Sequence, residues 1–246
     1  MQILIFNSYT TGQKHKLDNP LSAEDCSSSD RLKSRIKELC GFNEEGWRDN
    51  SRDYRLPAGE MFSGPLSVQL KEGLKQVREH EDYGKTSVDL YYPWYYCRVD
   101  GKQSPVNEND IIVPFDTAPL HELEVLEFDE SEVPERTVDL LESYDLVFSL
   151  LRPDDIESLQ RVFEVERSVP IIFLLPKSQR KAVNEDLPNV HVVETGRTLQ
   201  KKLRTTNWAL KGAVMRRLCE VACRDGFQVF EEVRQDPQKL LEIVKQ

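Results

Sequence analysis

Short apolar segments of this sequence end repeatedly in small polar or charged residues. Such segments are typical of buried strands, and the residues that follow parallel strands meet at one edge of a sheet, where ligands bind. Asn7 and Ser8 follow the first such segment, residues 2–6. Because several residues at this predicted edge are small or basic, we expect an anionic ligand there. The further candidates are Pro114, Phe115, Asp116, Ser149, Arg152, Lys177, Ser178, Thr195, Gly196 and Arg197.

The candidate catalytic residues are Asn7, Ser8 and Asp116, for which a family resemblance of residues 3–12 implies cleavage of an N-glycosidic bond. That reaction passes through a sugar with oxocarbenium character, so an enzyme must place a water near C1′ and stabilise positive charge. We expect the carboxamide of Asn7 to orient the water and Asp116 to stabilise the sugar cation or act as base. No lysine stands out as a Schiff-base nucleophile, so we expect a monofunctional reaction that uses water.

Aromatic residues are available to hold a base outside the duplex. Stacking would offset the few kcal/mol that unstacking a base costs. The alternative is that these residues fill a corner of the hydrophobic core. The predicted base pocket consists of Tyr9, Phe62, Tyr91, Trp94, Tyr95 and Phe115.

The sequence is acidic overall but contains one basic segment. The formal net charge is −10, whereas residues 177–217 hold ten Lys and Arg against three Asp and Glu. This asymmetry favours a focused contact with phosphates over indiscriminate coating of nucleic acid. An ordinary solvated helix face is the alternative. The predicted nucleic-acid-binding residues are Lys177, Arg180, Lys181, Arg197, Lys201, Lys202 and Arg204.

Several classes of protein are disfavoured because their motifs are missing. The sequence has neither the Gly-x-Gly-x-x-Gly nor the P-loop pattern that binds phosphates, and it has no Gly-x-Ser-x-Gly elbow. Its four histidines are isolated, so we expect no metal and no cofactor. No apolar run approaches the roughly 20 residues of a membrane helix, and the start lacks a signal-peptide pattern. We therefore expect a cytoplasmic protein with no membrane partner.

Strand-like segments alternate with helical patterns, which predicts an α/β fold. Apolar segments with strand character lie near residues 2–6, 87–92, 111–116, 144–149, 169–175 and 189–193. Helical patterns lie near residues 65–77, 154–164, 177–186, 208–224 and 237–244. We expect one domain over residues 1–246, a three-layer sandwich with a mainly parallel sheet, with the helices of residues 207–246 packed on it.

Two segments resemble known families. Residues 3–12, Ile-Leu-Ile-Phe-Asn-Ser-Tyr-Thr-Thr-Gly, resemble the first-strand signature of the uracil-DNA-glycosylase-like fold, in which a short strand delivers a catalytic Asp or Asn. Residues 56–64, Leu-Pro-Ala-Gly-Glu-Met-Phe-Ser-Gly, precede a helix, and residues 111–116 follow downstream. This arrangement is similar to a family found beside YaaA-type peroxide-stress proteins and to a domain of archaeosine-type tRNA-modifying enzymes.

The resemblance implies a DNA glycosylase that removes a modified base and leaves an abasic site, with defence against phage with modified DNA as its setting. The match to the family is incomplete. Residues 92–96, Tyr-Pro-Trp-Tyr-Tyr, stand where the family usually has Ser-Ala-Lys-Tyr-Gly-Leu, and Asn7-Ser8 stands where the family usually has Cys-Ser after the first strand. The zinc-binding cysteine cluster of tRNA transglycosylases is missing from the sequence, and DNA is favoured over tRNA as the partner.

Two other classes of function remain open. A non-enzymatic DNA-binding stress protein of the YaaA type would need the basic segment but neither Asn7 nor Asp116. A nucleotide N-ribosidase would need the catalytic residues but not the basic segment. Substituting Asn7 by alanine tests the first class, and reversing the charges of Lys201 and Lys202 tests the second.

Overall fold

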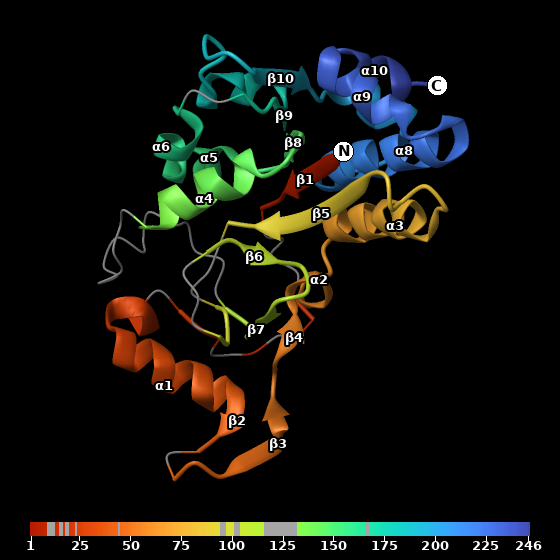
Figure 1. Ribbon diagram of the computed structural model, residues 1–246. Helices are drawn as coiled ribbons and strands as arrows, with labels where there is room; N and C mark the ends of the chain where they lie inside the picture. The colour runs from red at the N-terminus through yellow and green to blue at the C-terminus, as the bar shows by residue number, and fades with distance from the viewer. Residues whose placement is uncertain are drawn as a thin grey trace.

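The computed structural model describes residues 1–8, 13–14, 17, 20–22, 24–43, 45–93, 97–100, 104–115, 132–165 and 168–246. Within these residues, a central six-stranded sheet has the order β10-β9-β8-β1-β5-β6 (Figure 1). Neighbouring strands are parallel except at the edge, where β6 (Val106–Asn107) runs antiparallel to β5. The parallel strands are β1 (Gln2–Phe6), β5 (Ser87–Tyr92), β8 (Leu146–Ser149), β9 (Ile171–Leu175) and β10 (Val190–Glu194).

The parallel strands, numbered along the chain, follow the spatial order 2-1-3-4-5. The chain therefore winds outward in one direction from β1 to β5 and in the other from β8 to β10. The point of reversal lies between β1 and β8, and ligands of doubly wound sheets bind at the carboxyl ends of the strands at such a point. The central strands are mainly apolar, and every residue of β8 and β9 is buried, as expected for a sheet covered on both faces.

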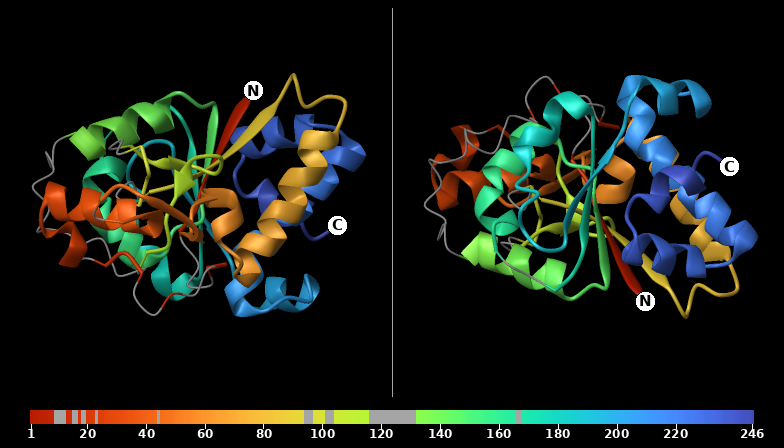
Figure 2. Two further views of the ribbon diagram at one scale, coloured as in Figure 1. Left: turned by 90° about the horizontal axis from the view of Figure 1, so that it is seen from below. Right: turned by 90° about the horizontal axis from the view of Figure 1, so that it is seen from above.

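One face of the sheet is covered by helices from two distant parts of the chain. These helices are α3 (Pro65–Glu79), α8 (Leu210–Asp225), α9 (Gln228–Gln235) and α10 (Lys239–Ile243). α3 and α8 lie side by side on this face (Figure 2), and apolar side chains of all four helices belong to one hydrophobic cluster with Ile3 and Ile5. Pro65 opens α3, where its missing N–H has no helical partner to lose.

Glycines allow the close approach of α3 and α8. A Cβ atom on Gly212 would lie 2.4 Å from the carbonyl oxygen of Leu66, and one on Gly73 would lie 2.7 Å from the Cα of Arg216. Both obstacles are backbone atoms, so a side chain can fit only if the helices separate.

We expect Gly212→Ala to lower the free energy of unfolding by about 1–3 kcal/mol, the usual cost of overpacking. Chemical denaturation monitored by circular dichroism measures the change. Gly84→Ala is the matched control, because a Cβ there meets no atom within 4 Å. Equal stability of the two variants would contradict the inferred contact.

The second face is covered by the connections between β5, β8, β9 and β10. Leu141, Ile156, Val162 and Phe163 from these helices pack against Leu4, Phe6 and neighbouring strand residues in a second hydrophobic cluster. The predicted helix over residues 177–186 is instead a shorter 3₁₀ helix, η3. These elements are α4 (Glu132–Glu142), α5 (Pro153–Ser158), α6 (Gln160–Phe163) and η3 (Lys177–Ala182), while α7 (Arg197–Lys202) and η4 (Asn207–Ala209) lead into α8.

The segment between β1 and α3 forms small elements outside the central sheet. Ser28 caps the N-terminus of α1, accepting a hydrogen bond from the N–H of Arg31 at 3.3 Å. The elements are η1 (Glu24–Ser27), α1 (Ser29–Leu39), the antiparallel pair β2 (Cys40–Phe42) and β3 (Arg48–Asp53), the antiparallel pair β4 (Leu56–Pro57) and β7 (Ile111–Ile112), and α2 (Ala58–Met61).

The predicted strand over residues 111–116 needs correction. Only Ile111 and Ile112 form a strand, and it pairs with β4 outside the central sheet. Pro114 and Phe115 therefore do not follow a parallel strand of the sheet, and Asp116 lies outside the described residues. The antiparallel pairing with β4 provides hydrogen-bond partners for the backbone of this two-residue strand.

The prediction of a mixed α/β fold with a mainly parallel sheet is confirmed. That the chain is one domain stays a prediction, although α8, α9 and α10 contribute to the hydrophobic cluster on the sheet, as expected for residues 207–246. Among the described helices, none combines the length and apolarity needed to cross a membrane.

Candidate functional site at the ends of β1 and β8

The carboxyl ends of β1 and β8 lie together at the point where the sheet reverses its winding. Phe6 is opposite Ser149 in the parallel register, and the N–H of Leu150 donates a hydrogen bond of 2.8 Å to the carbonyl of Phe6. Asn7 continues directly from Phe6, and its N–H donates to the carbonyl of Tyr91 on β5 at 2.9 Å. Asn7 and Ser149 therefore lie at the same edge of the sheet but face opposite sides of it, because Ser149 is in register with Phe6 and Asn7 is the next residue along the strand.

The side chains of Asn7 and Ser149 are buried, and neither has a hydrogen-bond partner among the described residues. Asn7 is 0% exposed, and neither its Oδ1 nor its Nδ2 has a partner within the described part of the chain. The buried hydroxyl of Ser149 likewise has no partner there. Because an unsatisfied buried polar group costs about 1–3 kcal/mol, such groups call for an explanation, and a bound ligand or water is one.

Ser8 has a different environment, because it connects β1 to the start of α5. Its hydroxyl accepts a hydrogen bond of 2.7 Å from the N–H of Arg152 and donates a short one to the carboxylate of Asp155. Arg152 Nε and Nη2 also donate to Asp155, at 3.0 and 3.1 Å. These hydrogen bonds raise the pKa of the Arg152 guanidinium. The Ser8 hydroxyl is thus engaged as donor and acceptor, which suits a structural link better than a free nucleophile.

Lys211, in the first turn of α8, reaches the same strand end. Its Nζ donates to the carbonyls of Leu150 and Leu151, at 3.2 and 2.6 Å. The surrounding protein withdraws the ammonium from water and lowers its pKa to about 7, an effect that Asp155 opposes and Arg152 reinforces. The N–H of Leu150 donates a hydrogen bond to the carbonyl of Phe6, which directly precedes Asn7. The Lys211 amine therefore contacts the backbone segment that is paired with the end of β1.

The aromatic residues of the predicted base pocket lie in different surroundings. The rings of Phe62 and Phe115 are 0% and 1% exposed and belong to the hydrophobic core, with centroids 6.1 Å apart. Tyr92, at 4.8 Å from Phe62, packs beside them, which agrees with the alternative of a core corner, and their role in a base pocket stays a prediction. Tyr91, on β5, is half-buried beside Asn7. Tyr9, Trp94 and Tyr95 lie outside the described residues.

The predicted nucleic-acid-binding residues are exposed and begin at the same edge of the sheet as Asn7. Lys177 lies two residues after the end of β9, and Arg197 lies three residues after the end of β10. Arg180 pairs with the carboxylate of Glu185. The exposed basic residues are Lys177, Arg180, Lys181, Arg197, Lys201, Lys202 and Arg204.

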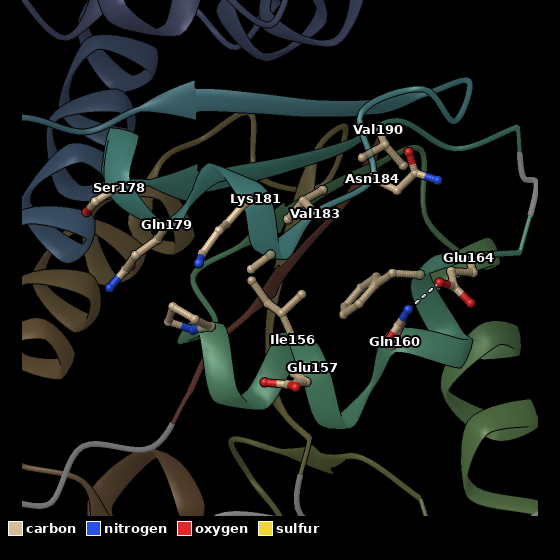
Figure 3. A pocket seen from close by; sticks show the side chains of 13 residues that line it. Ile156, Glu157, Gln160, Glu164, Ser178, Gln179, Lys181, Val183, Asn184 and Val190 are labelled. Atoms are coloured by element: carbon tan, nitrogen blue, oxygen red, sulfur yellow. Dashed lines mark hydrogen bonds between the residues drawn. The ribbon is translucent and has the colours of Figure 1, made fainter.

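A separate groove of about 670 Å³ lies between η3 and the α5–α6 segment (Figure 3). Lys181 contributes to one wall, while Glu157 and Glu164 contribute to the other. Of the predicted basic residues only Lys181 lines this groove, and Asn7, Ser8 and Ser149 do not. Its mixed charge distinguishes it from a phosphate site, so we assign the candidate site to the strand ends instead.

Comparisons with models of protein families and with curated proteins find no match to this chain. In the part of the chain that the structure describes, no group of three or more His, Cys, Asp or Glu side chains is arranged to hold a metal ion. The function therefore has to be argued from the strand-end site itself.

Sequence reasoning identified Asn7, Ser8, Ser149 and Arg152, which the structure places at neighbouring strand ends. It missed Asp155 on α5, which accepts a hydrogen bond from Ser8, and Lys211 on α8, which donates to the carbonyl of Leu151. Asp155 carried a weak signal, since an acid three residues after Arg152 in the first turn of a helix can pair with it. Lys211 carried no such signal, because it comes from a helix about 60 residues away from the carbonyls that it contacts.

Proposed function

We propose that this chain is a DNA glycosylase that hydrolyses the N-glycosidic bond of a modified base, and that its sheet is a variant of the uracil-DNA-glycosylase-like fold. The observation that carries the proposal is the unpaired carboxamide of Asn7, buried at the carboxyl end of the strand where the sheet reverses. A carboxamide offers both a donor and an acceptor. It can therefore orient a water molecule or recognise the edge of a base.

The surrounding residues suit a substrate that is part of a polyanion. Exposed basic residues follow β9 and β10 along the same edge as Asn7. In this proposal Asn7 contacts the water and the reacting nucleoside, while the basic side chains hold the phosphates on either side. Defence against phage that carry modified DNA is the biological setting proposed for this activity.

The test incubates the full chain and its Asn7→Ala variant with unmodified DNA, DNA from phage that carry modified bases, and tRNA. Mass spectrometry detects released bases, and an aldehyde-reactive probe counts abasic sites. We expect free base and abasic sites from one modified DNA, with a loss of about 10²- to 10³-fold in rate for the variant, the usual effect of removing one positioned polar group. Gln2→Ala, an exposed position at the other end of β1, is the matched control.

The remaining outcomes separate the competing functions. Salt-sensitive binding of DNA by both proteins, with no base released, would contradict the glycosylase and favour a non-enzymatic DNA-binding protein. Turnover of free nucleotides that survives charge reversal at Lys201 and Lys202 would favour a nucleotide N-ribosidase. A glycosylase acting on a polymer should lose most of its rate in that double variant, and the loss should shrink as salt is raised, because salt screens the phosphate contacts that the wild type retains.

A further inference from the structure

The amine of Lys211 is a nucleophilic group at the strand-end site that the hydrolytic reaction does not use. Within the described residues no carboxylate lies within 4 Å of its Nζ, and its hydrogen-bond partners are two backbone carbonyls. The exposed Lys85, by contrast, pairs with Asp82 at 2.7 Å. Lys211 as a whole residue is half-buried, and its amine is the buried end of the side chain.

The two carbonyl contacts match the neutral amine as well as they match the ammonium. A neutral amine has two N–H groups and one lone pair, and the carbonyls of Leu150 and Leu151 can accept both N–H groups. The lone pair then remains available for attack. Burial of the amine lowers its pKa to about 7, so a large fraction is neutral at neutral pH.

The position of the amine relative to the unpaired groups supplies the second argument. Lys211 binds the carbonyl of Leu150, whose N–H binds the carbonyl of Phe6, and Asn7 follows Phe6 directly. Arg152 and Asp155, the charged groups closest to the amine, bind each other and Ser8. A sugar that contacts Asn7 would therefore lie near the Lys211 amine, since α8 covers the face of the sheet on which Asn7 falls.

We propose that Lys211 forms an imine with C1′ of the abasic deoxyribose left by base removal, and that the chain thereby also cleaves the DNA strand. This inference rests on the proposed function, because base removal supplies the abasic sugar.

The step balances without a further reactant. The Nζ lone pair attacks the C1′ aldehyde of the ring-opened sugar, and one water leaves as the imine forms. A C2′ proton then passes to water, its electron pair forms the C2′–C3′ double bond, and the C3′–O bond breaks with departure of the 3′ phosphate. Water hydrolyses the imine and returns the amine.

The experiment uses the full chain and an oligonucleotide that already contains one abasic site, so it does not depend on base release. Cyanoborohydride reduces the imine to a stable secondary amine, and peptide mapping by mass spectrometry locates the adduct. We expect one adduct on Lys211 in the wild-type chain, and at least a tenfold loss of adduct and of strand cleavage in Lys211→Met and Lys211→Arg. Lys75→Met, an exposed lysine of α3, is the control and should match the wild type.

The outcomes distinguish this inference from the proposed function. An adduct on Lys211 without base release from any DNA would support the imine and contradict the glycosylase. Base release with no adduct, or with adducts spread over surface lysines, would overturn the inference and leave the glycosylase intact. Because peptide mapping is done on the wild-type chain, the result holds even if a Lys211 variant fails to fold.

Discussion

Replacing Asn7 by leucine is expected to stabilise the protein and to abolish base release. Leucine has the branched shape of asparagine but no polar atoms, so it removes two buried atoms that have no partner among the described residues. Relief of that penalty should raise the free energy of unfolding by about 1–3 kcal/mol and the melting temperature by about 3–8 °C. The same change removes the group proposed to orient water, so the rate of base release should fall at least about 10²-fold.

Thermal unfolding of the two proteins measures the change in stability, and detection of released base measures the change in rate. Added DNA should stabilise the wild-type protein more than the variant, because the variant keeps the basic side chains but lacks the contact through Asn7. Ile5→Leu, a conservative change inside the same strand, is the control for repacking near the site. An Asn7→Leu variant that is markedly less stable than the wild type would show that the carboxamide is satisfied in solution and would remove the main support for the site.

Replacing Asp155 by alanine is expected to cause the largest loss of stability at the site. The Asp155 side chain is 1% exposed and accepts hydrogen bonds from Ser8 and from two nitrogens of Arg152. Arg152 is 38% exposed and can return to water, which limits the cost of losing its partner. We therefore expect the free energy of unfolding to fall by about 2–4 kcal/mol.

Urea denaturation measures this change, with Asp154→Ala as the matched control. Asp154 is the exposed neighbour on the same helical turn and should change stability by less than about 1 kcal/mol. Ser8→Ala should be intermediate, because it removes one hydrogen bond to the carboxylate and keeps the ion pair. If Asp155→Ala and Asp154→Ala are equally stable, Asp155 does not join β1 to α5.

The parallel strands of the central sheet could be predicted because most are short segments rich in apolar residues. The edge strand β6, a Val-Asn pair, carried no such signal. The segments predicted at residues 2–6, 87–92 and 169–175 form strands at residues 2–6, 87–92 and 171–175. The segment at residues 111–116 has the same composition but forms a two-residue strand elsewhere. Composition alone does not distinguish these cases, because which strands pair is decided by contacts between distant parts of the chain.

The candidate site was predictable only where its residues directly follow strands. Asn7, Ser8 and Ser149 were found in this way, since parallel strands end at a common edge. Asp155 and Lys211 belong to helices, and their roles depend on how α5 and α8 are placed on opposite faces of the sheet. The burial of Phe62 and Phe115 likewise depends on packing against Tyr92, which no spacing in the sequence reveals.

The contact between Gly212 and Leu66 also governs how sensitive the site is to distant substitutions. Gly212 adjoins Lys211 in the first turn of α8, and its fit against the backbone of Leu66 fixes how deeply that turn sits against α3. A bulkier residue would push α8 outward and carry the Lys211 amine away from the carbonyls at the end of β8. The packing of α8 against α3 thus sets the position of the Lys211 amine. Substitutions in this apolar helix interface are therefore expected to alter the reactivity of the amine before they unfold the protein.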